Sequence, residues 1–271
     1  LARKAEDLRI DLGGGIVLEF VAIPAGEFIM GDSNASLDEH PRAPVRIRKP
    51  FLMARLEVSN ELFKLYDKDH DTAYISMTNK DQSNRGHPIN SPRQPVARVS
   101  WQEANGFCRW LSEKTGRKFS LPTEAQWEWA CRAGTATPFF YGDYNVDFGQ
   151  YANLADISIE KLALRDSPPW HPKDNRFNDG IMITSNTGKY QSNAWGLRDM
   201  HGNVAEWTRS LQKKYPYNDE DGRNDMAAQG KRAVRGGSWY DRPYRASSAY
   251  RLAYEPYQKV YNVGFRVICE E

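Results

Sequence analysis

The chain has 271 residues, a formal net charge of +2 at pH 7, and 40% hydrophobic and 12% aromatic residues. This nearly balanced charge excludes a general attraction to nucleic acid or to a membrane surface, so we expect no nucleic-acid partner. No apolar run has the length of a membrane-spanning helix, and the N-terminus lacks the apolar core of a signal peptide. A chain of this length can bury a substantial core without disulfides.

The first third of the chain reads as short strands separated by turns. Residues 1–15 are a charged lead-in that ends in three glycines, which we interpret as a flexible joint because no Gly-Lys-Ser/Thr follows. Apolar alternation predicts a hairpin formed by Val17–Ile23 and Glu27–Gly31. Strand-like sequence resumes at 45–47 and 51–56.

Residues 32–44, between these predicted strands, form a polar loop that carries Asp38, Glu39 and His40. These three side chains offer ligands for a metal, but we expect them to be solvated, as charged loop residues normally are. Further along, Ser59 is placed to cap a short helix over 60–67.

Two helix starts carry the capping-box pattern, in which the N-cap and N3 side chains satisfy free backbone donors. The pattern is present at Ser100–Glu103 and again at Thr123–Gln126. We expect the first helix to stop near Gly116 and the second to end before Gly134. The last predicted element is a strand with alternating apolar residues over Asn262–Ile268.

The stretch 193–207 places two carboxylates, Asp199 and Glu206, seven residues apart around a Gly-Asn pair. A tight turn would bring both carboxylates to one point, together with the carbonyls of Gly202 and Val204. Carboxylate and backbone oxygens are the ligands of calcium. A Gly-Asn hairpin turn with two solvated acids explains the same spacing equally well.

Three cysteines, Cys108, Cys131 and Cys269, show no CxxC spacing, which argues against a cysteine-only metal site. The odd number allows at most one disulfide and leaves the redox compartment open.

Seven segments, in the same order along the chain, resemble the formylglycine-generating enzyme family, also known as the sulfatase-modifying-factor domain. A single block of this kind would be weak evidence, whereas seven in register are strong. They are Ile23–Gly31, Glu57–Asn60, Pro95–Trp101, Leu121–Ala130, Gly196–Trp207, Arg235–Trp239 and Asn262–Arg266.

The resemblance implies a single α+β domain over residues 16–271, a loop-rich variant of the C-type-lectin fold with little regular secondary structure. It also implies two structural calcium sites. The first uses the side chains and carbonyls named above. The second would use the side chains of Asn153 and Asp179 with the carbonyls of Leu154 and Ile181. The resemblance further favours an exported or periplasmic bacterial protein, and we expect a monomer.

The resemblance does not extend to the copper site of the family, where two cysteines five residues apart hold Cu(I). The corresponding positions here are Asp241 and Ala246. A carboxylate and a methyl group do not replace two soft thiolates. We therefore expect no copper cofactor and no copper-dependent formylglycine formation.

Three functions remain compatible with these residues. The first is a domain that binds a peptide or a small anionic or aromatic ligand in the inherited groove. The second is an oxidase or tailoring enzyme without copper, similar to the pyoverdine-maturation member of the family. The third, an iron enzyme of the ergothioneine type, is disfavoured because the chain lacks the HxxxHxE motif and the helical domain of that group.

The groove implied by the resemblance contains arginines and tyrosines suited to bidentate hydrogen bonds and stacking. A salt-bridged surface turn is the alternative. Asp241, Tyr240 and Ser238 are the candidate catalytic residues. The ligand-binding candidates are Trp239, Arg242, Tyr244, Arg245 and Asn262. The resemblance also implies a disulfide between Cys108 and Cys269, which leaves Cys131 as a thiol.

Overall fold

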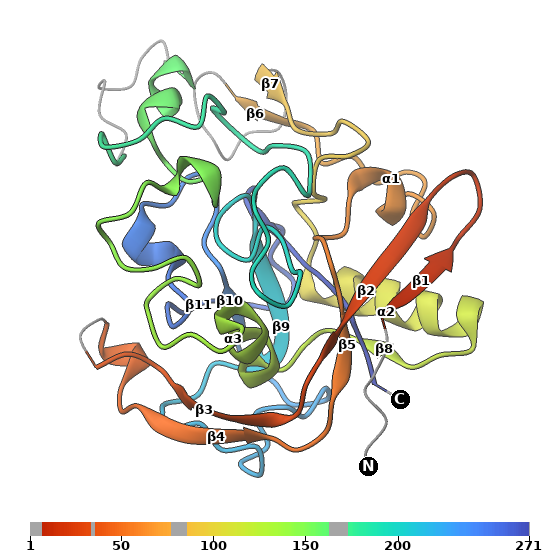
Figure 1. Ribbon diagram of the computed structural model, residues 1–271. Coiled ribbons are helices and arrows are strands. Elements are labelled where there is room, and N and C mark those ends of the chain that lie inside the picture. The colour runs from red at the N-terminus through yellow and green to blue at the C-terminus, as the bar shows by residue number, and fades with distance from the viewer. Residues whose placement is uncertain (1–6, 34–35, 77–85, 163–172, 271) are drawn as a thin grey trace.

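The computed structural model describes residues 7–33, 36–76, 86–162 and 173–270 (Figure 1). These residues form an α+β structure in which three helices, one of them a single turn, and several short strands are joined by long irregular segments. The helices are α1 (Asn60–Phe63), α2 (Trp101–Thr115) and α3 (Glu124–Arg132), and the 3-10 turns are η1 (Leu37–Glu39), η2 (Phe148–Gln150), η3 (Ile157–Leu162) and η4 (Pro243–Ala246).

Two larger sheets organise the described residues. The first has the order β1 (Leu8–Asp11), β2 (Val17–Ile23), β5 (Phe51–Ala54), β13 (Ile268–Cys269), β8 (Phe119–Ser120). The second has the order β11 (Leu252–Tyr254), β10 (Arg232–Arg235), β9 (Ala205–Leu211), β12 (Val263–Gly264). Two-stranded ribbons are formed by β3 (Gly26–Met30) with β4 (Ala43–Ile47), and by β6 (Tyr74–Ser76) with β7 (Gly86–Pro88).

Both predicted capping boxes are confirmed. The side chain of Ser100 accepts a hydrogen bond from the backbone of Glu103, and Thr123 does the same for Gln126. At the other end α2 stops at Gly116, whose φ of 72° is the left-handed conformation that glycine adopts without strain. Local side-chain chemistry therefore sets the limits of both long helices.

Strand pairing differs from the prediction in three places. The hairpin predicted between β2 and β3 is wrong, because β2 pairs with β1 and β5 while β3 pairs with β4. Gly13–Gly15 is not a joint but the turn that lets β1 fold back onto β2. The predicted strand over 262–268 is divided, since β12 joins one sheet and β13 the other. The helix predicted over 60–67 is the single turn α1.

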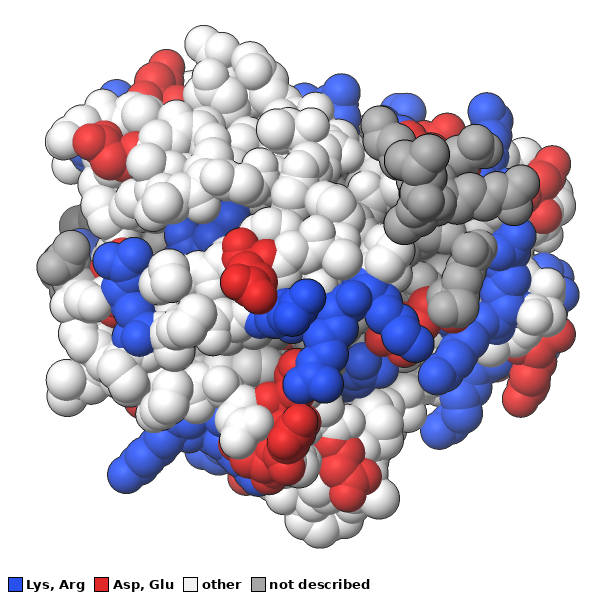
Figure 2. Space-filling view, turned by 60° about the horizontal axis from the view of Figure 1, so that its bottom comes forward, with Lys and Arg blue, Asp and Glu red and all other residues white. Residues whose placement is uncertain are grey.

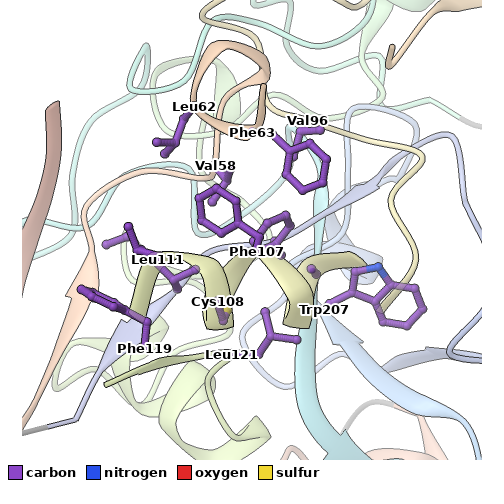
Figure 3. Close-up of a cluster of buried hydrophobic side chains, with 14 of the residues drawn as sticks. Val58, Leu62, Phe63, Val96, Phe107, Cys108, Leu111, Phe119, Leu121 and Trp207 are labelled. Carbon is purple, nitrogen blue, oxygen red and sulfur yellow. The ribbon is translucent and has the colours of Figure 1, made fainter. Parts of the chain in front are cut away.

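The largest buried cluster lies between α2 and the two sheets (Figure 3). From α2, Phe107, Cys108 and Leu111 point into it, and Phe107 packs against Phe63 at 5.8 Å between ring centroids. Trp207 enters from β9 and donates its indole N–H to the carbonyl of Val99. Truncation of a buried Phe to Ala typically costs about 3–5 kcal/mol, so this cluster anchors α2 to β9.

The face that carries β3 and β4 mixes basic and acidic side chains (Figure 2). Two exposed pairs on it are Arg46 with Glu27 at 3.6 Å and Arg48 with Glu220 at 3.3 Å. Such exposed pairs contribute little to stability. Within the described ranges we find no helix of the length and hydropathy that a membrane span requires.

Candidate functional site

Ser238 and Asp241, in the segment after β10, form one hydrogen-bonded group with Asn262, which lies directly before β12. The hydroxyl of Ser238 donates to Asp241 Oδ2 at 2.6 Å and accepts from Asn262 Nδ2 at 2.7 Å. On its other oxygen, Asp241 faces Arg245 Nε at 3.3 Å. Asp241 is almost fully buried, and this burial raises the pKa of its carboxyl, an effect that Arg245 and Ser238 partly offset. The structure thus brings four of the predicted residues together.

The surface beside this group is aromatic and cationic. The guanidinium of Arg242 lies over the ring of Tyr244, at 5.4 Å from its centroid, and 49% of Tyr244 is exposed. Arg245 donates from Nε to the hydroxyl of Tyr250 at 3.0 Å. Arg242 and Tyr244 are therefore available to a ligand, whereas Arg245 and Tyr250 are half-buried.

Trp239 and Tyr240 have different positions. Trp239 is buried and packs, with ring centroids 5.3 Å apart, against Tyr240, which is half-buried. Both rings also contact Tyr261. Trp239 therefore belongs to the packed interior and is not available as a surface contact, although the sequence predicted it as a ligand-binding residue.

Around Asp199 and Glu206 the chain makes the predicted turn, with Asp199 and Gly202 both at positive φ. Both carboxylates are buried, so the interpretation as solvated acids of a hairpin turn is wrong. Glu206 receives Arg266 on both oxygens, at 2.8 Å and 2.6 Å, and the indole N–H of Trp127 at 2.7 Å. Its lone pairs are therefore already engaged.

Asp199 and Glu57 add further buried negative charge at the same place. Burial raises the pKa of Asp199 to about 6, and Glu206 adds to the shift while Gly188 and Arg266 oppose it. The pKa of Glu57 is raised well above its usual value by burial and by the other two acids. Oδ1 of Asp199 has no hydrogen-bond partner among the described residues. Three buried carboxylates thus lie near Arg266.

The second predicted calcium group lies against the first. Asn153 pairs with Gly202 through a β-bridge, and its carbonyl accepts from the N–H of Asn203 at 2.9 Å. Its side-chain Oδ1 has no partner among the residues that the structure describes. A Cβ at Gly202 would lie 2.1 Å from the Asn153 carbonyl oxygen, so only glycine allows this approach.

Asp179, the other side chain of the second group, is engaged elsewhere. Its Oδ1 accepts from the N–H of Ile181 at 2.7 Å, and its Oδ2 accepts from the hydroxyl of Tyr190 at 2.5 Å. Burial raises its pKa to about 6. Leu154 is buried beside Asn153, in the aromatic cluster with Phe148. In the described ranges no group of three or more His, Cys, Asp or Glu side chains is arranged to hold a metal.

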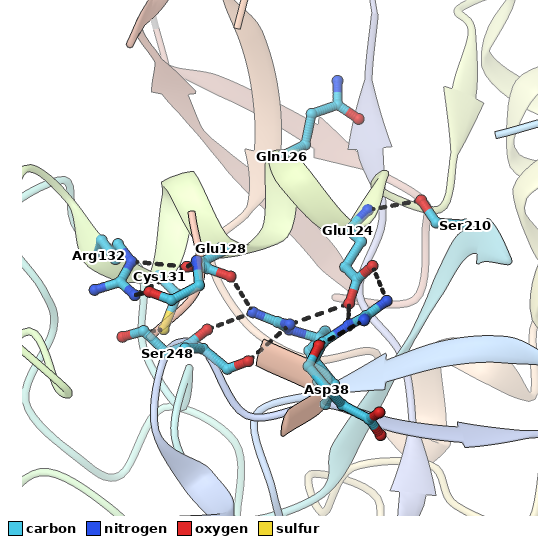
Figure 4. Close-up of polar contacts among 12 residues, drawn as sticks. Asp38, Glu124, Gln126, Glu128, Cys131, Arg132, Ser210 and Ser248 are labelled. Atoms are coloured by element: carbon cyan, nitrogen blue, oxygen red, sulfur yellow. Dashed lines mark hydrogen bonds and ion pairs between the residues drawn. The ribbon is translucent and has the colours of Figure 1, made fainter. Parts of the chain in front are cut away.

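A buried charge network that the sequence did not predict joins α3 to Arg235 of β10 and to Arg251 (Figure 4). Arg235 of β10 contacts Glu124 at 3.1 Å and Glu128 at 2.5 Å, both on α3. Arg251 also pairs with Glu124, and Arg132 pairs with Glu128. All five side chains are buried. The available signal was the i, i+4 spacing of Glu124, Glu128 and Arg132, which places them on one helix face.

This network also holds the polar loop between β3 and β4. Arg132 donates to the carbonyl of Gly31, whose N–H donates to Glu128, and Arg251 donates to the carbonyl of Asp38. The expectation that Glu39 is solvated is wrong, because only 1% of it is exposed. The loop is therefore packed at Gly31 and Glu39, while Leu37 and Asp38 are exposed.

The disulfide implied between Cys108 and Cys269 is absent, and both residues are buried thiols. Cys269 lies in β13 and Cys108 in α2, within the same apolar cluster. Burial raises the pKa of the Cys108 thiol, which opposes thiolate formation.

Comparison with known proteins identifies the family. Residues 16–271 match the family described as "Sulfatase-modifying factor enzyme 1-like domain", and the chain belongs to this family. It is 27% identical to the formylglycine-generating enzyme of Bos taurus, over 92% of this chain and 74% of that protein. It is 26% identical to the inactive C-alpha-formylglycine-generating enzyme 2 of Bos taurus, over 95% and 90%.

A solved structure has the same fold. PvdO from Pseudomonas aeruginosa superposes with a TM-score of 0.70 and 26% identity, covering 93% of this chain and 94% of that one. Within the family this chain is a non-canonical member, because aspartate and alanine stand at positions 241 and 246.

Proposed function

We propose that this domain binds a peptide or a small anionic or aromatic ligand beside residues 238–245, without copper-dependent oxidation. The observation that carries the proposal is the environment of Asp241, which pairs with Ser238 and Arg245 where the family has a copper cysteine. At the second cysteine position Ala246 is buried and offers only a methyl group. The similarity to an inactive family member is compatible with this conclusion.

The chemistry of the surface supports the ligand class. Arg242 and Tyr244 form an exposed cation–aromatic pair, and Arg245 with Tyr250 forms a second pair that is half-buried. A guanidinium binds a carboxylate through two parallel hydrogen bonds and stacks on an aromatic ring. An acidic group next to an aromatic ring would use both kinds of contact at once.

The proposal is tested with a panel of fluorescent acidic and aromatic peptides, measured by anisotropy. Arg242→Ala should remove a charge-assisted contact and weaken the binding of the best peptide by about 1.5–3 kcal/mol. Arg46→Ala, an exposed arginine on β4, is the matched control and should bind normally. Equal affinity of wild type and Arg242→Ala would place the ligand elsewhere.

A separate assay addresses oxidation. A cysteine-containing sulfatase-type peptide is incubated with the protein, copper and oxygen, and is then analysed by mass spectrometry. We expect the cysteine to stay unmodified, because hard oxygen and a methyl group do not hold Cu(I). Formylglycine in the peptide would refute the proposal outright.

An oxidase or tailoring enzyme that works without copper is the second candidate function. Buried Asp241 has a raised pKa, as a general base requires, and the similarity to PvdO over nearly the whole of both chains is compatible with this candidate. Oxygen consumption that the purified protein sustains with a candidate substrate, and that Asp241→Asn abolishes, would favour it over simple binding.

Calcium as a structural ion is also part of this proposal, as is the assignment of the fold to the loop-rich C-type-lectin variant. The open Oδ1 of Asp199 and the three buried acids around Arg266 favour a cation near the turn 199–206. Glu206 is a less suitable ligand for the ion, because its oxygens already accept hydrogen bonds from Arg266 and Trp127. The ion would neutralise repulsion between acids that the turn brings together.

A further inference from the structure

Asp241 is a buried acid in contact with one side of a partly exposed arginine, Arg245. Oδ1 of Asp241 lies 3.3 Å from Nε of Arg245, and only 4% of the Asp241 side chain is exposed. The same Nε donates to the hydroxyl of Tyr250 at 3.0 Å. The two terminal amino groups of Arg245 have no hydrogen-bond partner among the described residues, and 38% of this side chain is exposed. This end of the guanidinium is therefore open to a ligand.

An anion bound at the open end of Arg245 would share a single positive charge with Asp241. On the basis of the proposed function, in which residues 238–245 bind an anion, binding brings a second negative charge to an arginine that already neutralises one carboxylate. Two like charges at one site disfavour the ionised form, most of all for the buried group. Burial already raises the pKa of Asp241, although Arg245 and Ser238 oppose this shift. Uptake of a proton by Asp241 removes the repulsion.

The neighbouring charged and titratable groups keep their protonation states near neutral pH. Asp174 accepts hydrogen bonds from Arg176, which lower the pKa of its carboxyl, so it stays ionised. Burial raises the pKa of Tyr250, so its hydroxyl stays neutral. Arg242 is an arginine and stays cationic. Among these groups, Asp241 is therefore the one whose charge changes when an anion arrives.

The hydrogen bonds around Asp241 accommodate a neutral carboxyl. Oγ of Ser238 donates to Asp241 and accepts from Nδ2 of Asn262, whose buried Oδ1 has no partner in the described ranges. A protonated Asp241 can donate to Ser238, and Ser238 can donate to Oδ1 of Asn262 once the amide has turned over. One unpaired amide atom replaces the other, so no hydrogen bond is lost.

We propose that an anionic ligand binds at residues 238–245 together with a proton, which Asp241 takes up from solvent. The ligand and the neutral acid then share Arg245 without repulsion, and no covalent bond between heavy atoms changes. Affinity is highest in acid, where Asp241 is neutral with and without ligand. It falls as the pH rises from the pKa of Asp241 in the free protein to its higher pKa in the complex, by up to about tenfold per pH unit, and is constant above.

The first experiment measures binding of naphthalenesulfonate by isothermal titration calorimetry from about pH 4.5 to about pH 8.5. The sulfonate stays ionised over this range, so a change in affinity reports the protein. Wild type should bind more weakly at the upper pH, by about tenfold for each unit by which the ligand raises the pKa of Asp241. Asp241→Asn resembles the neutral acid and should bind at every pH as wild type binds in acid. Asp174→Asn removes a carboxylate that stays ionised, so this control should keep the pH dependence of wild type.

A second measurement uses wild type alone and does not depend on how the variants fold. Binding heats in two buffers of different ionisation enthalpy give the number of protons taken up with each ligand, which should be positive and largest where the affinity changes most steeply with pH. An affinity that changes by less than about twofold over the range, or an Asp241→Asn variant that keeps the pH dependence, would overturn proton coupling alone. Absence of binding at every pH would overturn the proposed function as well.

Discussion

Glu39→Gln should make the protein more stable at alkaline pH while having little effect in acid. Glu39 is buried at the end of η1, and its Oε2 has no hydrogen-bond partner in the described ranges. Burial raises its pKa from 4.5 to about 7. Arg235 and the backbone of Ser36 oppose this shift, and Asp32 and Glu128 add to it. Glutamine has the same shape but carries no charge at any pH.

The difference between the pKa of Glu39 in the folded chain and in the unfolded chain determines how the substitution changes stability with pH. Below pH 4.5 the carboxyl is neutral in both the folded and the unfolded chain, so it does not lower the free energy of unfolding. Between pH 4.5 and 7 only the unfolded chain is ionised, and the free energy of unfolding falls as the pH rises. A difference of about 2.5 pKa units corresponds to about 3 kcal/mol once the pH exceeds 7.

Urea unfolding of both proteins at about pH 4 and pH 8 measures this difference. Glu39→Gln should be more stable than wild type by up to about 3 kcal/mol at pH 8 and nearly equal to it at pH 4. Glu27→Gln, an exposed acid on β3, serves as the control and should show no such pH dependence. A stability difference that is equal at the two pH values would refute the reasoning, because it would mean that Glu39 titrates normally in the folded state.

Two further predictions concern calcium and the thiols. Chelation of calcium should lower Tm by about 5 °C or more, because the ion binds only the folded state, and Asp199→Ala should make Tm insensitive to the chelator. An unchanged Tm in wild type would remove calcium from the turn. Thiol titration of the denatured, unreduced protein should give three thiols, since Cys108 and Cys269 are not bonded. A single thiol would restore the disulfide that the family resemblance implies.

The helix limits could be predicted from the sequence because their causes are local. A cap at Ser100 or Thr123 requires only a partner three residues away, and both helices begin as expected. Strand positions were also readable, since β2 and β5 begin at the predicted residues. The limits of an element are therefore set mainly by neighbours within one turn.

The pairing of strands and the burial of side chains could not be predicted from local sequence, because they depend on residues far apart in the chain. Nothing near Val17–Ile23 indicates that its neighbour is β5 and not β3. Glu39 looks like a loop residue until its neighbours Arg235 and Glu128 are known. In the candidate site, the grouping of Ser238 with Asn262 was predicted from family resemblance, whereas the pairing of Glu206 with Arg266 was not predicted.

The place of β13 affects how the chain can be made. This strand, at Ile268–Cys269, lies between β5 and β8 and joins them in the sheet that the described residues form. During synthesis both strands emerge long before the residues that join them, so their facing edges stay unpaired until β13 has been made. Unpaired edges are templates for association with other chains. A chain cut before Ile268 should therefore aggregate, even though almost all of its core residues are present.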